Sequence, residues 1–486
     1  MLTRRHFLKT TVAATASLSA ASYLRAQGAN DDVRIAYVGM GSKVKIGGMG
    51  RNDMKGNRSV PGVRVAAICD VDSVHLGYAI DDCKQNNENP ATFRDVRKLL
   101  EQKDIDAVWV TTPNHWHALV CIWSLQAGKH VFVQKPVCHS IFEGRKMVEA
   151  ARKYDRIVYS STLTRSQEGF KEAAQYALAG NLGKPLYIHA VRFGVRTSIG
   201  KVSAPTPIPA SIDYDLWCGP APVKPVMREY LHYDWHWDWD YGNGELGNWG
   251  IHLLDGAREV AGRGLPNSVL SVGGRFGYDD DGQTPNTQIT FYDYDPVPII
   301  YEMRAMPRNK GLWKNDLWAD KDMDDLHGEK YATSVACEGG YTIGNKAFDK
   351  DGKRIREFNP ELKPVRNAFF DAIRGRDAMP YYDIAEAHNS AGLVHLGNIS
   401  HRVGKTTSPQ QIRERIGANS NFRQTWDRML AHLEANEIDL QKTPPTLGAF
   451  LQFDPVTERF TGELAQEANQ HVKRDYRKEF VVPEVV

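Results

Sequence analysis

From residue 33 onward, short runs of β-branched and aromatic residues alternate with longer stretches of helical periodicity. The apolar runs that predict strands cover residues 33–38, 63–69, 107–110, 131–133 and 157–159. Strands that alternate with helices predict a doubly wound parallel sheet, in which ligands bind beyond the carboxyl ends of the strands. We therefore expect an α/β Rossmann domain over residues 31–155.

This alternation stops after residue 165. A helix is predicted over 171–178, a strand over 186–193 and an amphipathic helix over 383–401,. The order predicts a second α+β domain, residues 156–406.

Residues 407–486 form a C-terminal extension. Within it, residues 450–455 and 460–462 have the alternation and turn residues of a small hairpin,. Such an extension covers a sheet edge or mediates contacts between copies of the chain, and the sequence leaves both alternatives open.

The first 26 residues have the pattern of an export signal. Arg4 and Arg5 form a paired-arginine region, an uncharged stretch follows over residues 10–24, and Ala26 offers a small residue for signal peptidase,. The uncharged stretch is too short and too rich in Ala, Ser and Thr to span a bilayer. Residues 1–26 therefore predict a twin-arginine signal peptide and a periplasmic protein, with an ordinary N-terminal helix as the alternative.

Composition narrows the class of partner. Of the 486 residues, 42% are hydrophobic and 25% are charged, which suits a globular protein of two or three domains,. The net charge is +2 and the basic residues are scattered, so a small, largely neutral partner is expected instead of a nucleic acid. The six cysteines include no CxxC pair, which favours buried thiols over a zinc site or a disulfide framework.

The turn after the first predicted strand has the glycines of a phosphate-binding loop. Gly39 and Gly41 would let a diphosphate approach the backbone N–H groups at a helix start,. Val44 stands at the place of the third glycine, so a bare tight turn is the alternative. Asp70 ends the second strand, where its carboxylate could accept ribose hydroxyls and would repel a 2′-phosphate, favouring NAD over NADP. Because Asp70 follows Gly39 by 31 residues instead of about 20,, we expect residues 49–61 to be an inserted loop.

Three further segments complete a pattern of motifs. They are TTPNHWH at 111–117, VQKP at 133–136 and GNGELGNWGIHLLD at 242–255. In this order they resemble the TPNxxH, EKP and GGGxLxDxGxHxxD motifs of the Gfo/Idh/MocA (glucose–fructose oxidoreductase/inositol dehydrogenase) family, and the resemblance covers about residues 33–400. The family implies a second domain with an open, mostly antiparallel sheet, and a homo-oligomer.

The resemblance assigns catalytic roles to Lys135 and His252, which in the family flank the nicotinamide and the reacting hydroxyl. A histidine near neutrality suits proton removal from an alcohol, and a lysine can stabilise developing alkoxide charge. The alternatives are a surface lysine and a structural histidine. It also implies that the cofactor cleft is lined by Thr112, Pro113, Asn114 and His117, although helix capping by Asn114 is nearly as well supported.

Two positions depart from the family pattern. Asn248 replaces an aspartate, so it supplies no charge to support an imidazolium, and we expect His252 to be a weak base while Asn248 acts in catalysis or binds a substrate hydroxyl,. Gln134 replaces the EKP glutamate, a smaller change because both side chains accept hydrogen bonds.

Residues 230–241 are unusually aromatic. If this segment is an extended strand, Trp235 and Trp237 share one face while His236 lies on the other,. Indoles beside polar groups suit a site for sugar rings, and burial of the indoles in the core is the equally supported alternative. A metal site formed by His232, His236 and the aspartates is a minor alternative; we expect no metal.

These observations predict an NAD-dependent oxidoreductase for a secondary alcohol of a sugar, glycoside or cyclitol. Because free nicotinamide nucleotides are scarce outside the cytoplasm, an exported enzyme is expected to hold NAD tightly. The family resemblance also offers an NAD-dependent glycoside hydrolase or lyase that works by transient oxidation and elimination. A non-catalytic sugar-binding protein is the third alternative.

Overall fold

The computed structural model describes residues 32–43, 47–160, 162, 167–262, 264–359, 365–376, 382–417 and 419–486. The predicted signal peptide, residues 1–26, lies outside the described residues. None of the described helices is long and apolar enough to cross a membrane.

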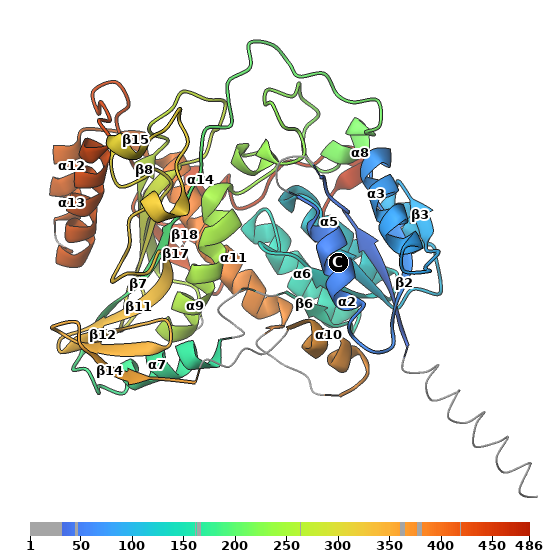
Figure 1. Ribbon diagram of the computed structural model, residues 1–486, viewed down its shortest axis with the longest axis horizontal. Coiled ribbons are helices and arrows are strands. Elements are labelled where there is room, and N and C mark those ends of the chain that lie inside the picture. Colours follow the sequence, from blue (N-terminus) through green and yellow to red (C-terminus); the bar gives the residue numbers. More distant parts are fainter. Residues whose placement is uncertain are drawn as a thin grey trace, which may run out of the picture.

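The first domain is a Rossmann sheet of six parallel strands (Figure 1). In chain order these are β1 (Val33–Val38), β2 (Val63–Cys69), β3 (Ala91–Phe93), β4 (Ala107–Val110), β5 (His130–Val133) and β6 (Val158–Tyr159). Their order in the sheet is β3-β2-β1-β4-β5-β6, so the direction of winding reverses between β1 and β4. The five predicted strands are confirmed, and the short β3 was not predicted. Ligands bind at such a reversal point in doubly wound sheets.

Helices cover both faces of this sheet. They are α2 (Met49–Asn57), α3 (Ser73–Lys84), α4 (Val96–Leu100), α5 (Asn114–Gln126), α6 (Ile141–Lys153) and, from far along the chain, α10 (Val365–Ile373). Phe369 and Phe370 of α10 pack against Trp109 of β4. The Rossmann domain therefore extends beyond the predicted limit at residue 155, because β6 and α10 complete it.

The second domain contains a mixed, mostly antiparallel sheet. Its central strands are β7 (Pro185–Phe193), β8 (Ser268–Gly274), β9 (Thr287–Tyr292), β10 (Ile299–Arg304) and β11 (Tyr331–Cys337), and β12 (Gly340–Ile343), β13 (Lys346–Asp349) and β14 (Arg354–Glu357) extend one edge. Only β7 and β10 pair in parallel among the described strands of this sheet. The sheet confirms the fold class expected from the resemblance.

Helices α9 (Ile251–Ala261) and α11 (Ile384–Val403) pack between this sheet and the Rossmann domain (Figure 1). Asp383 caps α11 by accepting a hydrogen bond from the backbone N–H of Ala385. The predicted helix is confirmed, but it is not amphipathic, because every residue from Ser390 to Ser400 is buried. Helix α7 (Glu168–Leu178) is the predicted helix that precedes β7.

The C-terminal extension covers a sheet edge. Its strands β16 (Thr446–Leu447) and β17 (Leu451–Asp454) both pair with β8, and β17 forms the predicted hairpin with β18 (Arg459–Thr461). Helices α12 (Pro409–Ile416) and α13 (Ser420–Ala435) lie on the outer face of the sheet (Figure 1). The chain then returns to the Rossmann domain, where Phe480 packs on Trp116 with ring centroids 5.5 Å apart.

Candidate functional site

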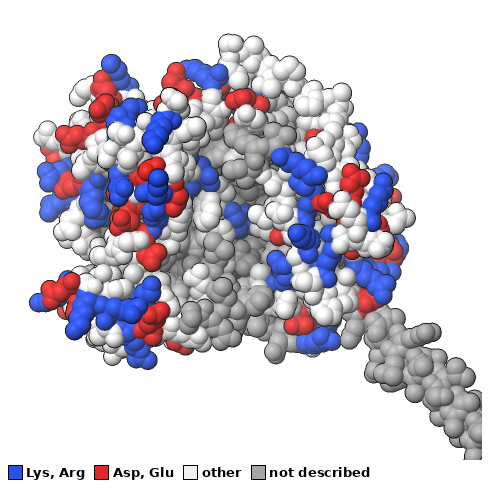
Figure 2. Space-filling view, viewed as in Figure 1, with Lys and Arg blue, Asp and Glu red and all other residues white. Residues whose placement is uncertain are grey.

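A cavity of about 1090 Å³ lies at the carboxyl ends of β1, β2, β4 and β5, where residues of the second domain close over the Rossmann sheet. Figure 2 shows the hollow between the two domains and the charged side chains of both signs interspersed over this face. The cavity wall includes nearly all residues that the sequence predicted for the site: Gly39, Gly41, Asp70, Thr112, Pro113, Asn114, His117, Gln134, Lys135, Trp235, His236, Asn248 and His252. Trp237 is the predicted residue that is not among them.

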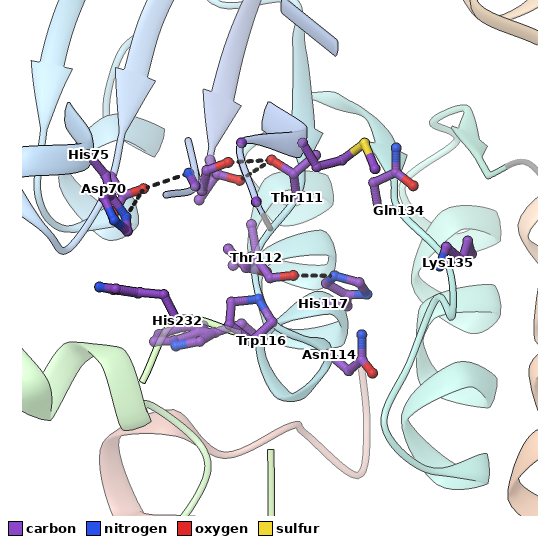
Figure 3. Close-up of a pocket in the computed structure, with 18 of the residues that line it drawn as sticks. Asp70, His75, Thr111, Thr112, Asn114, Trp116, His117, Gln134, Lys135 and His232 are labelled. Atoms are coloured by element: carbon purple, nitrogen blue, oxygen red, sulfur yellow. Dashed lines mark hydrogen bonds and ion pairs between the residues drawn. The ribbon is translucent and has the colours of Figure 1, made fainter. Parts of the chain in front are cut away.

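The cavity has two chemically different ends (Figure 3). The close-up places Asp70 with His75 and His232 at one end, Gln134 and Lys135 at the other, and Thr112 and His117 between them. The first end offers carboxylate and imidazole groups, whereas the second presents the candidate catalytic lysine.

The glycine turn after β1 leaves no room for side chains. Gly39 and Gly41 have φ angles of 88° and 77°, and a Cβ on Gly41 would lie 2.5 Å from the backbone nitrogen of Gly48. The expected insertion over 49–61 is wrong, because Met49–Asn57 is helix α2. The additional residues instead precede this helix. Gly50 takes the packing role of the third glycine, since a Cβ there would lie 2.1 Å from the carbonyl oxygen of Gly39,.

Asp70 holds the glycine turn in place. Its carboxylate accepts hydrogen bonds from the backbone N–H groups of Met40 at 2.7 Å and Asp72 at 2.9 Å, and burial raises its pKa above the ordinary value,. A contact between Asp70 and a ribose stays a prediction.

The segment after β4 presents polar groups to the cavity. The Oγ1 of Thr112 is buried and finds no hydrogen-bond partner within the described part of the chain, which a bound polar ligand would provide. Asn114 does not cap α5: the N-cap residue is Pro113, and Asn114 is the first helical residue. The His117 ring lies 2.8 Å from the Thr112 carbonyl oxygen and 2.7 Å from that of Pro136, so it connects the two motifs that border the cavity.

These features fit a dinucleotide. The turn at Gly39 and Gly41 is a cradle that any Cβ would fill, and the buried Oγ1 of Thr112 lies on the same cavity wall. Backbone N–H groups at such a turn bind a diphosphate.

Gln134 is held by an acidic residue, Asp53, that was not predicted from the sequence. Its Nε2 donates to the Asp53 carboxylate of α2 at 2.8 Å, and the indole N–H of Trp109 donates to the same oxygen at 2.9 Å. Burial raises the pKa of Asp53. An amide at position 134 can donate to this carboxylate, whereas the family's glutamate would repel it.

Lys135 and Asn248 contact each other across the two domains. The Lys135 ammonium donates to the backbone carbonyl of Asn248 and lies 3.4 Å from its Oδ1. Burial lowers the pKa of Lys135 to about 8, and the nearby carboxylate of Glu245 opposes this shift. Glu245 is itself buried and paired with Arg192 and Arg196, each at 2.7 Å.

The carboxylate of Glu245 lies close to the amide of Asn248, which replaces the family's aspartate. The Nδ2 of Asn248 lies 3.4 Å from Oε2 of Glu245, so a negative charge is present one turn earlier than in the family motif. Both residues lie in or beside the π-helical turn η3 (Leu246–Gly250) that leads into α9. π-Helical turns are frequent at functional sites.

His252 lies on the first turn of α9, at the cavity wall. Burial lowers its pKa well below the ordinary value, the positive charge of Lys135 lowers it further, and Asp255 opposes the shift. The expectation of a weak base therefore has the right direction, with burial and Lys135 as its causes.

The aromatic segment is not a strand. Residues Asp234–Trp237 form the 3₁₀ helix η2, in which the backbone N–H groups of His236 and Asp238 donate to the carbonyl oxygens three residues earlier,. Trp237 is 4% exposed and packs beside Tyr233 and Arg196, so the prediction that it lines the substrate site is wrong. Trp235 belongs both to an apolar cluster and to the cavity wall, and His236 stacks on it with centroids 3.7 Å apart.

Asp72 and His75 were not predicted as site residues, and His232 was predicted only as part of a minor metal-site alternative. The structure brings these three side chains together. The spacing Asp72-x-x-His75 directly after Asp70, at a helix start, is the signal that could have identified the first two,.

Two family models match the chain. One, described as "Oxidoreductase family, NAD-binding Rossmann fold", matches residues 33–162, and one described as "Oxidoreductase family, C-terminal alpha/beta domain" matches residues 180–301. Together the two matches cover just over half of the chain.

Curated relatives match over shorter stretches. A glycosyl hydrolase family 109 protein from Shewanella baltica is 28% identical over 223 residues, covering 40% of this chain and 47% of the relative. An inositol 2-dehydrogenase from Salmonella paratyphi B is 28% identical over 140 residues, covering 29% of this chain and 41% of the relative. The chain thus spans less than half the length of these curated relatives.

Solved structures share the fold. WlbA dehydrogenase from Bordetella pertussis, in complex with NADH and UDP-GlcNAcA, has a TM-score of 0.52 at 16% identity and covers 76% of this chain and 97% of that one. GenD2 from gentamicin A biosynthesis, in complex with NAD, has a TM-score of 0.50 at 14% identity, with coverages of 75% and 93%. At these identities the likeness shows the fold alone.

Proposed function

The chain belongs to the Gfo/Idh/MocA oxidoreductase family, and from this premise we propose that it is an NAD-dependent oxidoreductase for a secondary alcohol of a sugar, glycoside or cyclitol. The observation that carries the proposal is the convergence of Lys135, Asn248 and His252 from two domains on one end of the cavity. The names of the relatives, an inositol dehydrogenase and a glycosyl hydrolase, support a carbohydrate or cyclitol substrate.

The cofactor's position follows from the cavity's two ends. The turn at Gly39 and Gly41 would hold the diphosphate, Asp70 the adenosine ribose, and Thr112 would supply a further hydrogen bond,. A carboxylate at position 70 favours NAD over NADP because it repels a 2′-phosphate. When bound, NAD supplies the hydride acceptor that alcohol oxidation requires.

The chain's own residues handle the proton and the oxygen. His252 is neutral at neutral pH because burial lowers its pKa, so it can accept the hydroxyl proton of the substrate. Lys135 donates a hydrogen bond to the same oxygen and stabilises its developing negative charge. Asn248 orients the ammonium of Lys135 through its backbone carbonyl, and the Glu245 carboxylate favours the charged form of Lys135.

A second candidate function uses the same residues. The match of 223 residues to a glycosyl hydrolase family 109 protein favours a glycoside hydrolase or lyase. In that reaction a transient carbonyl acidifies the neighbouring C–H group, so that a weak base such as His252 suffices for elimination. The two functions differ in their net redox change, which is zero for the hydrolase.

Export and cofactor retention are further parts of the proposal. The paired arginines at the start of the chain support a twin-arginine signal and a periplasmic location,, and a folded protein exported by this route would carry its NAD tightly bound. Cell fractionation with N-terminal sequencing tests this location. We expect protein cleaved near residue 26 in the periplasmic fraction. Protein that stays in the cytoplasmic fraction with an intact N-terminus, and is absent from the periplasm, would contradict export. We further propose a homo-oligomer, which light scattering of the purified protein tests.

Substitution of the two candidate catalytic residues tests the assignment. Lys135→Ala and His252→Ala should each lower turnover of an active carbohydrate by about 10²–10⁴-fold. Lys98→Ala is the matched control, because Lys98 is an exposed lysine of α4 that pairs with Glu101. Turnover that survives both site substitutions at the level of the control would show that these residues are not catalytic.

A further inference from the structure

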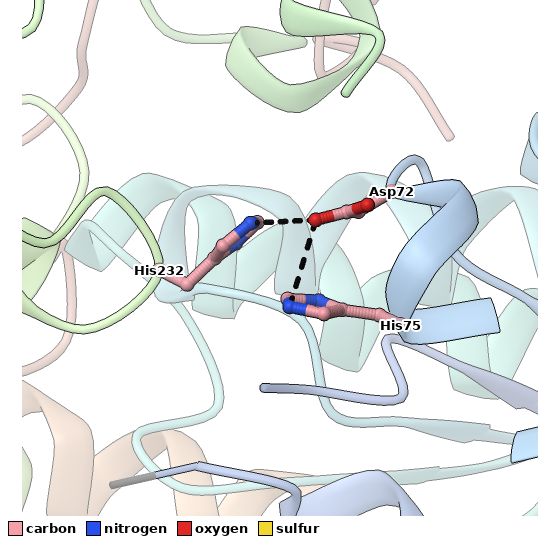
Figure 4. Close-up of side chains that lie close together, drawn as sticks. All are labelled: Asp72, His75 and His232. Carbon is pink, nitrogen blue, oxygen red and sulfur yellow. Dashed lines mark hydrogen bonds and ion pairs between the residues drawn. The ribbon is translucent and has the colours of Figure 1, made fainter. Parts of the chain in front are cut away.

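Asp72, His75 and His232 form a compact cluster at the Asp70 end of the cavity (Figure 4). Asp72 is the N-cap residue of α3 and His75 lies in the first turn of that helix, whereas His232 comes from the second domain, two residues before η2. One nitrogen or oxygen atom of each side chain lies within 4.8 Å of those of the other two. The cluster therefore joins the two domains through three side chains that are common metal ligands.

The carboxylate of Asp72 directs one oxygen at both imidazoles. Its Oδ1 accepts a hydrogen bond from the backbone N–H of Val74, which fixes the side chain. Its Oδ2 lies 3.0 Å from Nε2 of His232 and 3.5 Å from Nε2 of His75. The two imidazole rings contact each other, with centroids 4.1 Å apart.

The two separations from Asp72 suit a tetrahedral ion, and the three ligand atoms all lie within 4.8 Å of one another. Zinc binds imidazole nitrogen and carboxylate oxygen at about 2.0–2.1 Å, so two ligands of a tetrahedral site lie about 3.3 Å apart. The observed distances of 3.0 and 3.5 Å bracket that value. Two of the three side chains are buried, Asp72 at 4% and His75 at 5% exposed, and His232 is half-buried.

The surroundings of His75 support the same conclusion. While Nε2 of His75 faces Asp72, its Nδ1 faces Oδ2 of Asp70 at 3.9 Å. Histidine ligands commonly direct their second ring nitrogen toward a carboxylate, which sets the tautomer and orients the ring.

We propose that Asp72, His75 and His232 bind one divalent transition-metal ion, with zinc as the best-matched metal. Three protein ligands leave a fourth position for water, and this position faces the cavity because His75 and His232 both line it. The ion ties the segment around His232 to the start of α3 and closes the Asp70 end of the cavity. This site is separate from Lys135 and His252, and it does not depend on the proposed function.

Metal binding to the full-length protein tests the proposal. The protein is dialysed against EDTA and titrated with Zn²⁺ by calorimetry and with Co²⁺ by visible absorption, which reports tetrahedral coordination. We expect about one Zn²⁺ per chain, an intense Co²⁺ spectrum and a higher unfolding temperature with Zn²⁺. His75→Ala and His232→Ala should each weaken Zn²⁺ binding by at least about tenfold.

Two further variants make the result decisive. His327→Ala removes an exposed histidine of the loop before β11 and should bind Zn²⁺ like the unmodified protein. Near-ultraviolet circular dichroism checks that each variant is folded. Asp72→Asn keeps the oxygen that caps α3 but removes the negative charge, so it should weaken Zn²⁺ binding, and it replaces a histidine variant that fails to fold. Absence of Zn²⁺ binding by the unmodified protein would overturn the proposal, as would equal binding by Asp72→Asn and His327→Ala.

Discussion

The Nε2 of Gln134 donates a hydrogen bond to the carboxylate of Asp53 over 2.8 Å. This contact gives the glutamine at position 134 a role that the glutamate of the family motif could not fill, because an ionised carboxylate has no hydrogen to donate. Asp53 is half-buried, and its carboxylate already accepts a hydrogen bond from the indole N–H of Trp109. A carboxylate at position 134 would have no proton to donate to Asp53 and would repel it. The amide at position 134 is therefore matched to the carboxylate of Asp53 on helix α2.

Gln134→Glu should destabilise the protein. The new carboxylate would lose the hydrogen bond and repel Asp53, at a cost of about 1–3 kcal/mol in the free energy of unfolding at neutral pH. Urea denaturation measures this difference. Gln126→Glu adds the same charge at the exposed end of α5 and should change stability by less than about 0.5 kcal/mol. Equal effects of the two substitutions would argue against the Gln134–Asp53 contact.

The pH dependence of turnover should report the charge of Lys135. Burial lowers its pKa to about 8, so the ammonium form predominates below that pH and is lost above it. If the cation stabilises the developing alkoxide, kcat should fall as the pH rises through about 8. Lys135→Arg should move this alkaline limb to higher pH, because guanidinium stays protonated. A kcat that rises through the same range would instead make neutral Lys135 the proton acceptor.

Gly50 should be required for the shape of the dinucleotide turn. A Cβ at this position would lie 2.1 Å from the Gly39 carbonyl oxygen, so Gly50→Ala must displace either α2 or the turn. We expect the Kd for NAD to rise by about tenfold or more, measured by calorimetry on nucleotide-free protein. Gly77→Ala is the control, because nothing lies within 4 Å of its added Cβ in α3. It should bind NAD unchanged and gain about 0.5–1 kcal/mol of stability. Unchanged NAD affinity in Gly50→Ala would contradict this role.

Glu458 should stabilise the attachment of the C-terminal hairpin in a pH-dependent way. Burial raises its pKa, but hydrogen bonds from His388 at 2.7 Å and from Arg145 outweigh burial and lower the pKa from 4.5 to about 2. Because the folded-state pKa is depressed, the stabilisation is complete above about pH 4.5 and is lost as the pH falls toward 2.

Glu458→Gln should accordingly cost about 2–3 kcal/mol at neutral pH and much less near pH 2. Chemical denaturation across this pH range measures the loss, with Glu463→Gln, an exposed residue of the same extension, as the control. A loss that is independent of pH would show that the charge of Glu458 is not its source.

The Rossmann strands could be predicted well because their apolar runs are almost entirely buried: all four residues of β4 are buried, and in β1 only Arg34 is exposed. It missed β3, whose three residues are largely exposed and carry no such pattern. The alternation of the aromatic segment is compatible with a strand, whereas the structure has the 3₁₀ helix η2 there.

Site residues that belong to local motifs could be predicted from the sequence. Site residues that reach the cavity only through contacts between distant parts of the chain could not. The ends of β4 and β5 supplied Thr112 and Lys135 directly. Asp53 lies 81 residues from Gln134 and His232 lies 160 residues from Asp72, and no local pattern relates positions so far apart. Gly50 was not predicted because it follows Gly39 by 11 residues, whereas the third glycine of the G-x-G-x-x-G pattern follows the first by about five.

The central claim is that the cavity holds NAD and uses it on a carbohydrate alcohol. The most direct test is mass spectrometry of the nucleotide released by denaturing the purified mature protein, before and after incubation with a panel of sugars, cyclitols and glycosides. We predict that NAD is released beforehand and that NADH accumulates with one class of alcohol. NAD that stays oxidised while a glycoside is cleaved would favour the hydrolase. Absence of any bound nucleotide, together with no redox change when NAD is added, would contradict the account.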